Sequence, residues 1–402
     1  SANLRDACFT AAARRSHLPY RAAFVADSGA GMQALLTQYV AGQSPRGVFT
    51  GGVQTTETAV GFMFGGHDSV HSEVGKKLYA EVESYRSTVD DCAKLFNSLL
   101  DAPLLDVFFS ASLPAAALAH DQRYKQAAAF VSEYALAKMW KSLGVSAAAF
   151  VGQGVGEIAA ACMSGVFSLE DAVKLVVDRS AAGSVSFSAP RLPFISCGTG
   201  DVVPKGTVDA AAYWSRAPAS DARAVQRACM TMLSKGKCTA VIDVSPQPQL
   251  LSVAKTVEPG SQIAFAASAE SGQDEWFSVA AAAGAMHAAS VDVKWDVFFD
   301  DSACAHVRLP TYAWQMEKFW VEPMDDRVPP LPAWHYANKL VAAAAAAAPA
   351  GVEDTLTYEM EWMQAAEASS GAVGEAPKPA AGDFLRKVSS AKEDKRFDIV
   401  LQ

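Results

Sequence analysis

VGQGVGEIAAACMSGVFSLEDAVKLV, residues 151–176, is the stretch that decides the fold. The apolar run at 147–151 predicts a buried strand, and the residues after the GQGVGE turn predict a helix at 157–162. At a nucleophile elbow, a strand, a sharp turn of small residues and a helix follow one another in this order. We therefore predict a strand–turn–helix unit of α/β type around the turn.

Gly154 stands at the position where such an elbow carries its nucleophile. Glycine has no side chain to attack a substrate, and its backbone adopts a strained turn at low cost. Two other interpretations stay open. A dinucleotide fingerprint would need glycine at 157, where Glu157 would oppose a pyrophosphate, and an ordinary packing turn needs no chemistry. We predict no catalytic residue at this turn.

A nucleophile placed elsewhere would need a base within hydrogen-bond reach, usually a histidine. No histidine occurs between Asp121 and Met286. Cys162 and Ser164 are expected to pack or to cap a helix. Cys197 is the remaining thiol candidate, although the sequence places no cationic residue beside it that would lower its pKa.

Strand and helix patterns alternate over about 240 residues. The predicted strands are 21–26, 59–64, 147–151, 192–196 and 239–244. The predicted helices are 4–15, 32–41, 72–78, 89–100, 124–143, 157–162, 169–179 and 222–235. This alternation predicts a mainly parallel sheet with helices on both faces, preceded by a small α/β unit. The helix at 124–143 should bury an apolar face made of Phe130, Tyr134, Leu136, Met139, Trp140 and Leu143.

Composition excludes several classes of function. The formal net charge is −9 and no basic run occurs, so nucleic acid is not an expected partner. No apolar run approaches the roughly 18 residues of a membrane span, so we expect a soluble, cytoplasmic protein. The seven cysteines are scattered, and His67 and His71 have no carboxylate beside them in the pattern of a metal site. We expect no disulfide framework, no metal and no cofactor.

Several segments follow one another in the order of a known family. Residues 151–176 resemble the core of the acyl-CoA:carrier-protein acyltransferase domains in type I polyketide synthases. Within the domain, the other similar segments are GFMFGGHDSVHSEVGKKLY (61–79), RLPFISCGTG (191–200), Tyr213-Trp214 and VIDVSPQPQLL (241–251). RDACFTAAARRSHLPYRAAFVAD (5–27) and GVFTG (47–51) are similar to the ketosynthase-to-acyltransferase linker, and RLPTYAWQMEKFW (308–320) to the post-acyltransferase linker. LTYEMEW (356–362) is similar to the start of a following reductase-type structural subdomain. The resemblance implies a hydrolase-like α/β core.

The resemblance also implies where the family's catalytic residues are replaced. Gly154 matches the nucleophilic serine, Gln153 the preceding histidine, and His67 the glutamine whose backbone helps form the oxyanion hole. Gln247 matches the histidine of a Gly-Pro-His-Pro segment. Arg179 does match the arginine that holds an extender carboxylate, and it is expected to serve as a structural ion-pair partner or to retain a carboxylate pocket.

The family places a ferredoxin-like subdomain with the catalytic histidine after this arginine. Here Leu192 follows Arg179 after only a dozen residues, so the subdomain is expected to be reduced or absent. The implied divisions are a ketosynthase-to-acyltransferase linker domain at 1–55, an acyltransferase-like domain at 56–300, a post-acyltransferase linker at 301–323, and an irregular linker tail at 324–402 that leads into a processing domain.

These expectations combine into one predicted function. The chain is expected to be an inactive acyltransferase-like domain that scaffolds a neighbouring ketosynthase, through which the full protein would dimerise. It would also dock an acyl carrier protein or a trans-acting acyltransferase. The alternatives are a non-catalytic module that binds acyl-CoA or acyl-carrier, and an active transferase or hydrolase with a relocated nucleophile.

Overall fold

The structure is a computed structural model, and it describes residues 4–52, 58–66, 75–109, 121–208, 210–216, 220–258, 263–270, 272–299 and 304–310. All of them belong to one compact unit, Ser1–Thr311. The second unit, Tyr312–Gln402, lies outside the described residues, and with it the LTYEMEW segment at 356–362.

A six-stranded sheet forms the centre of the unit, with strand order β6-β5-β4-β3-β7-β8. Neighbouring strands run parallel except for β6, which pairs antiparallel with β5. The prediction of a mainly parallel α/β sheet is confirmed. The strands are β3 (Val60–Phe64), β4 (Ala147–Gly152), β5 (Phe194–Ser196), β6 (Asp201–Val202), β7 (Ala240–Asp243) and β8 (Ala264–Ala267).

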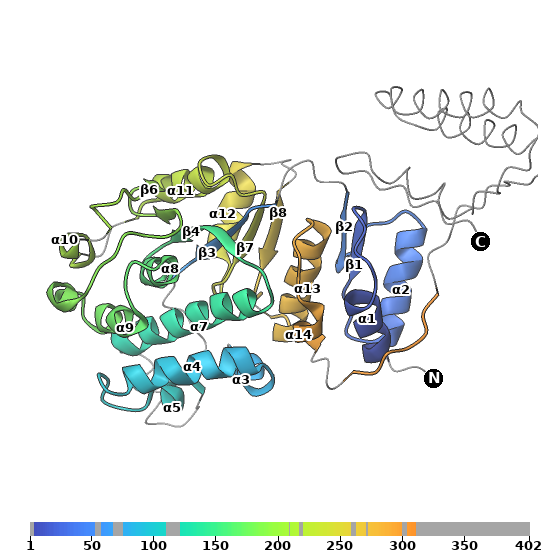
Figure 1. Ribbon diagram of the computed structural model, residues 1–402, viewed down its shortest axis with the longest axis horizontal. Helices are drawn as coiled ribbons and strands as arrows, with labels where there is room; N and C mark the ends of the chain where they lie inside the picture. Colours follow the sequence, from blue (N-terminus) through green and yellow to red (C-terminus); the bar gives the residue numbers. More distant parts are fainter. Residues whose placement is uncertain are drawn as a thin grey trace, which may run out of the picture. The chain divides into compact units, whose positions relative to one another are not determined.

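Helices cover both faces of this sheet (Figure 1). α11 and α12 lie on one face, α7, α8 and α9 lie on the other, and α4 packs outside α7. The bounds are α3 (Lys76–Glu81), α4 (Glu83–Phe96), α5 (Leu104–Phe109), α7 (Gln122–Ser142), α8 (Gly156–Ser164), α9 (Leu169–Val177), α10 (Ala211–Trp214), α11 (Ala222–Ser234) and α12 (Gln249–Val257).

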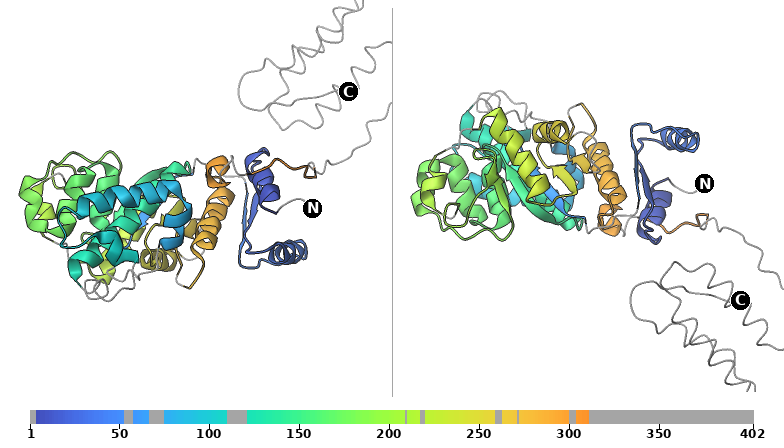
Figure 2. Two further views of the ribbon diagram at one scale, coloured as in Figure 1. Left: turned by 90° about the horizontal axis from the view of Figure 1, so that it is seen from below. Right: turned by 90° about the horizontal axis from the view of Figure 1, so that it is seen from above.

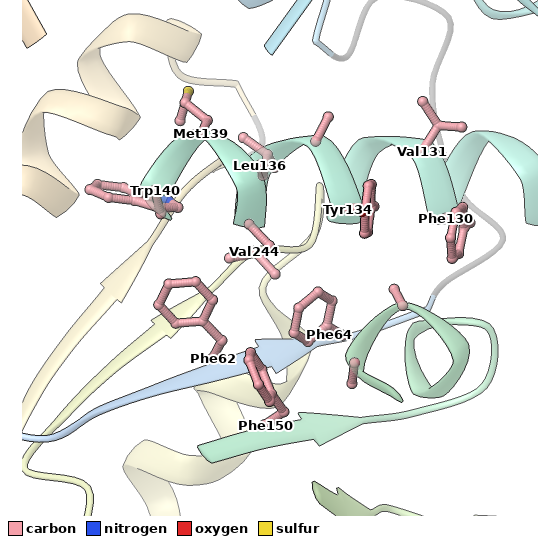
Figure 3. Close-up of a cluster of buried hydrophobic side chains, with 14 of the residues drawn as sticks. Phe62, Phe64, Phe130, Val131, Tyr134, Leu136, Met139, Trp140, Phe150 and Val244 are labelled. Atoms are coloured by element: carbon pink, nitrogen blue, oxygen red, sulfur yellow. The ribbon is translucent and has the colours of Figure 1, made fainter. Parts of the chain in front are cut away.

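Alternate residues of β3 serve the two faces of the sheet. Phe62 and Phe64 point toward α7, together with Phe150 of β4 (Figure 3), and Met63 belongs to the cluster between the sheet and α11. The six apolar positions predicted for the core face of helix 124–143 are all buried, which confirms that prediction.

The N-terminal residues form a second, two-stranded sheet. β1 (Arg21–Phe24) pairs antiparallel with β2 (Val48–Gly51). α1 (Leu4–Ala13) precedes β1, and α2 (Gly29–Val40) lies between the two strands in sequence. α13 (Glu275–Ala288) packs against both of these strands and also against β8 of the large sheet (Figure 2).

Small residues let α13 approach the N-terminal sheet closely. A Cβ added to Gly51 would lie 1.7 Å from the carbonyl oxygen of Ala288, so the strand backbone rests directly on the end of the helix. After α14 (Trp295–Phe299), the chain returns to α1, where Val307 N–H donates to Thr10 Oγ1 at 3.1 Å. The N-terminal elements are therefore held by residues from the far end of the unit.

Several predicted element bounds were wrong. α4 begins at Glu83, six residues before the predicted start, and α9 ends at Val177 instead of 179. Asp178 accounts for the second difference, because its carboxylate accepts a hydrogen bond from Ser180 N–H at 2.8 Å and caps a new 3₁₀ turn, Arg179–Ser184. The start of the helix predicted at 72–78 falls outside the described residues, and its described part continues to Glu81.

Residues 178–193, all of them described, contain no inserted subdomain. After the 3₁₀ turn the segment runs back beside the end of α8, where Ser188 N–H donates to Val166 O at 2.6 Å and Arg191 N–H donates to Ser164 O at 2.8 Å. It then enters β5. This agrees with the expectation that the ferredoxin-like subdomain is reduced or absent.

Among the helices that the structure describes, none combines the length and the apolar character needed to cross a bilayer.

Candidate functional site

The candidate site is the turn between β4 and α8. Gln153 N–H continues the sheet by donating to Phe64 O at 3.0 Å, and Gly156 N–H donates back to Gln153 O at 2.9 Å. α8 then begins at Gly156, directly after the turn. The predicted strand–turn–helix unit is therefore present, and the turn lies at the carboxyl edge of the sheet, where ligands of α/β proteins usually bind.

Two glycines with a positive φ of 60° meet at this edge, Gly154 in the turn and Gly66 after β3. A Cβ on Gly66 would lie 1.9 Å from Gln153 O, so no side chain fits there. A Cβ on Gly154 would meet only Gly66 O, at 3.3 Å. The turn therefore has nearly enough space for a nucleophile side chain, but it carries none.

Glu133 of α7 holds the turn after β3 by a hydrogen bond to the backbone of that turn. Its Oε1 accepts a hydrogen bond from Gly66 N–H at 2.6 Å, and the side chain is fully buried. Oε2 has no hydrogen-bond partner among the described residues. Burial, together with the nearby Asp243 carboxylate, raises the pKa of Glu133 well above its ordinary value.

Asp243, at the end of β7, holds the loop that follows. It accepts hydrogen bonds from Ser245 N–H at 2.9 Å, from the Ser245 hydroxyl, and from Leu251 N–H at 3.1 Å. Burial raises the pKa of Asp243 to about 6. The loop contains Gln247, whose carbonyl oxygen would lie 3.7 Å from a Cβ on Gly65. Gln247 is thus brought near the turn after β3.

Glu157 holds the start of α8, directly after the turn. This first-turn residue of α8 is fully buried, and its Oε1 accepts a hydrogen bond from the Tyr213 hydroxyl at 2.7 Å. Burial raises the pKa of Glu157, and hydrogen bonds from the Ser196 and Tyr213 hydroxyls oppose that rise. The Glu157 carboxylate, which was expected to oppose a pyrophosphate, therefore lies inside the fold and accepts hydrogen bonds from hydroxyl groups.

Arg179 reaches the turn itself. Its Nη2 donates to Gly154 O at 3.3 Å, while Nη1 is buried without a hydrogen-bond partner among the described residues. Burial lowers the pKa of Arg179, and the Glu157 carboxylate and Tyr213 oppose that change. No described carboxylate lies within 4 Å of the guanidinium as an ion-pair partner.

Of the predicted site residues, the structure brings four to the same edge of the sheet: Gly154, Gln153, Arg179 and Gln247. Gln153 turns outward, where its Nε2 donates to Ser220 Oγ at 3.1 Å. His67 lies outside the described residues.

The Cys197 thiol has an environment opposite to that of a nucleophile. It is fully buried, and burial raises its pKa, so it stays protonated. Ser164 is buried as well, and its hydroxyl donates to Ala161 O at 2.8 Å within α8. Within the described ranges, the histidines are His17, His287 and His306. The ring centroids of His17 and His287 lie 4.7 Å apart at the N-terminal sheet.

This geometry agrees with a family comparison. Residues 61–186 match the model of the acyl transferase domain, a range that begins in β3 and includes the turn and Arg179. Residues 61–186 therefore belong to an acyltransferase-like domain. The resemblance predicted from the motifs is confirmed.

The fold of the acyltransferase-like domain is similar to that of solved acyltransferase domains. The acyltransferase domain from the second module of the salinomycin polyketide synthase aligns with a TM-score of 0.63 at 22% identity, over 78% of this chain and 93% of that one. The acyl transferase domain of ZmaA aligns with a TM-score of 0.68 at 18% identity, over 77% and 92%.

The curated relatives of the acyltransferase-like domain are long, multidomain proteins. A PKS-NRPS hybrid synthetase from Aspergillus niger is 23% identical over 79% of this chain, which spans 23% of that relative. The erythronolide synthase EryA3 of Saccharopolyspora erythraea is 33% identical over 44% of this chain and 5% of the relative. The chain thus spans less than a quarter of the length of each of these relatives.

Sequence reasoning missed the burial of the carboxylates that support the turn, Glu133, Glu157 and Asp243. A weak signal existed for Glu133, which is a single acidic residue within the apolar run AAAFVSEYALA of α7. Charged residues are rarely fully buried unless they are bonded, so an acid on a core face indicates a polar contact in the interior. The sequence does not show that this contact is the backbone of Gly66.

Proposed function

We propose that this acyltransferase-like domain performs no acyl transfer and acts as a structural element of a polyketide synthase. It would hold an adjacent ketosynthase in shape and offer a surface to a carrier protein or to a trans-acting acyltransferase. The observation that carries the proposal is Gly154, which leaves the elbow without a nucleophile while the turn keeps its backbone geometry.

The electrostatics of the site support the same proposal. A general base must be able to accept a proton from the attacking group. The buried carboxylate of Glu133 accepts a hydrogen bond from Gly66 N–H, that of Glu157 accepts one from the Tyr213 hydroxyl of α10, and Arg179 donates to the backbone of the turn. The hydrogen bonds that these three side chains make thus support the fold around the elbow.

Incubation with radiolabelled malonyl-CoA tests the proposal. We expect no covalent label, and transfer onto a carrier protein at least about 10⁴-fold slower than for an active acyltransferase domain, the order lost when a hydrolase loses its nucleophile. The Gly154→Ser variant should also stay unlabelled, because the new hydroxyl would have no described base beside it. Gly183→Ser, at a position open to solvent, serves as the matched control.

One result would refute the inactive reading. This result is a label that maps to a single residue by mass spectrometry and that moves onto a carrier protein with turnover. Labelling of Gly154→Ser alone would show that a base is present after all, and that the glycine is a point lesion in a competent site.

One observation favours a second candidate, a module that binds an acyl carboxylate without chemistry. Nη1 of Arg179 is buried and lacks a hydrogen-bond partner in the described part of the chain, and an orphaned cation of this kind is suited to a carboxylate.

Calorimetry with malonyl-CoA separates the two candidates. The binding module predicts micromolar affinity that falls about 10- to 100-fold in Arg179→Ala, as a charge-assisted hydrogen bond would give. Arg191→Ala, at an exposed arginine, should leave the affinity unchanged. Acetyl-CoA, which has no free carboxylate, should bind as weakly as malonyl-CoA binds to Arg179→Ala. Absence of heat with either ligand supports the scaffold.

A further inference from the structure

A cavity of about 490 Å³ lies between the two-stranded sheet and the large sheet. β2 borders it on one side, the beginning of β8 on the other, and the end of α13 closes it. Its volume is within the range of about 300–1,000 Å³ that is usual for ligand pockets. None of the described residues that line it has an ionisable side chain. We call this space the intersheet cavity.

β8 borders the intersheet cavity with an unpaired edge, because it is the last strand of the large sheet. Ala264 N–H donates to Thr239 O at 3.2 Å, directly before β7. Ser268 N–H donates to Asp243 O, at the end of β7, at 2.9 Å. Since the backbone groups of a parallel strand alternate between its two edges, those of Phe265 point away from β7. Phe265 lines the intersheet cavity, so the free edge of β8 lies along it.

β2 borders the same cavity with its own unpaired edge. In the two-stranded sheet its partner is β1. Val25 N–H donates to Gly47 O at 2.8 Å, and the next pair along the ladder is Phe24 with Val48. Hydrogen-bonded and non-hydrogen-bonded pairs alternate in an antiparallel ladder, so the N–H and C=O of Thr50 point away from β1. Thr50 lines the intersheet cavity, which therefore has a free strand edge on each of two sides.

The two free edges run in opposite directions. Arg46, just before β2, donates through Nη2 to Glu270 Oε2, just after β8, at 2.5 Å. At the other end, Gly51 and Gly52 line the intersheet cavity together with Ile263, which directly precedes β8. The start of β2 is thus next to the end of β8. An extended segment placed between the strands could form backbone hydrogen bonds with both.

We propose that the intersheet cavity binds an uncharged, extended peptide segment, which adds as a strand between β2 and β8. Each of these strands has four residues, so the segment would span about four residues, or roughly 13 Å. An ionised side chain would enter a space without an opposite charge, which is costly. Phe49 and Phe265 line the space and favour apolar side chains. Backbone hydrogen bonds supply the affinity in other cases of strand addition.

The test uses the whole chain and a blocked tetrapeptide, acetyl-Val-Thr-Val-Thr-amide, as the probe. Amide hydrogen exchange is followed by mass spectrometry in residues 47–52 and 263–268. We expect the peptide to slow exchange in both segments, because amides at both edges become hydrogen-bonded. The same peptide with both valines N-methylated has no donors along one edge, and it should bind about tenfold more weakly or worse.

Two pairs of variants test the register. Phe265→Pro removes the N–H at the free edge of β8, whereas Phe265→Ala removes the ring and keeps the N–H. Thr50→Pro and Thr50→Ala form the corresponding pair on β2. Each proline variant should bind the peptide about tenfold more weakly than its alanine partner. Its melting temperature should stay close to that of this partner, since proline is tolerated where the N–H of an edge strand is unpaired.

Ala264→Pro is the contrasting control. It removes the N–H that donates to Thr239 O, so it should lower the melting temperature. If a proline variant at the free edges unfolds early, the N-methylated peptide still tests the hydrogen bonds with the wild-type chain.

Five outcomes would overturn the site. The first is absence of binding up to about 5 mM peptide, which is weaker than such a set of hydrogen bonds would give. The others are equal binding of the N-methylated peptide, equal binding by the proline and alanine variants, slowed exchange at one edge alone, and equal binding of acetyl-Glu-Thr-Glu-Thr-amide. The malonyl-CoA labelling is read independently, because the intersheet cavity does not include the elbow.

Discussion

Replacing Gly66 with alanine is expected to destabilise the domain by at least about 3 kcal/mol, because two costs fall on one residue. Its φ of 60° disfavours any L side chain. The added Cβ would also lie 1.9 Å from Gln153 O and 2.4 Å from Gly156 N, which are backbone atoms of the elbow and cannot rotate away. Either the turn after β3 or the elbow must move.

A graded series of glycine variants separates these costs. Gly206 has a φ of 87° and nothing within 4 Å of an added Cβ, so Gly206→Ala should cost only about 1–2 kcal/mol. The loss of stability in Gly154→Ala, where the added Cβ makes one contact at 3.3 Å, should lie between those of Gly66→Ala and Gly206→Ala. Thermal unfolding of the three variants measures the order. Equal losses for Gly66→Ala and Gly206→Ala would mean that the two turns are not in contact.

Glu133 gives the second large effect, and its two variants should behave in opposite ways. Glu133→Ala removes the acceptor of Gly66 N–H and leaves a cavity under the sheet edge, so we expect a loss of about 2–4 kcal/mol. Glu133→Gln keeps an amide oxygen for the same N–H and removes a buried acid. At pH 8 it should be at least as stable as the wild type.

The pH dependence follows from the raised pKa of Glu133. A carboxyl group whose pKa is higher in the folded state favours folding while it is protonated. That contribution is complete below the pKa of the unfolded chain, near 4.5, and is lost as the pH rises through the folded value. The stability of Glu133→Gln relative to the wild type should therefore increase as the pH rises above about 4.5.

Chemical denaturation at pH 4, 6 and 8 measures this difference. Asp243, with a folded pKa of about 6, stays in place in all three proteins, but its carboxylate interacts with Glu133, so its own loss of stability between pH 3.8 and 6 does not cancel fully in the comparison. The assignment of a protonated buried acid fails if Glu133→Gln is as unstable as Glu133→Ala at pH 8.

The centre of the fold could be predicted because its elements have strong patterns. α7 repeats large apolar residues at helical spacing, and β3 and β4 are short apolar runs that end at glycines. In contrast, α13 contains the run AAAAGAM, in which every residue is small or apolar and no periodicity distinguishes a face. α13 was not predicted, although it packs against both the N-terminal sheet and β8.

The candidate site could be placed from the sequence, but its support could not. The glycines of the turn and Arg179 belong to segments with recognisable order, so their meeting was expected from the family resemblance. Glu133 and Gly66 are far apart in the chain and meet only because α7 crosses beneath the end of β3. Local patterns contain no information on such a contact.

The position of α13 has a consequence for how the unit folds. This helix lies between the two-stranded sheet and β8, so it supplies apolar cover to both. α2 on its own contributes no buried residue to the N-terminal sheet. Since α13 comes some 250 residues later in the sequence, the contacts that order the N-terminal strands are among the most non-local in the chain. During synthesis, the strands β1 and β2 must therefore wait until α13 has been made before they can pack against it.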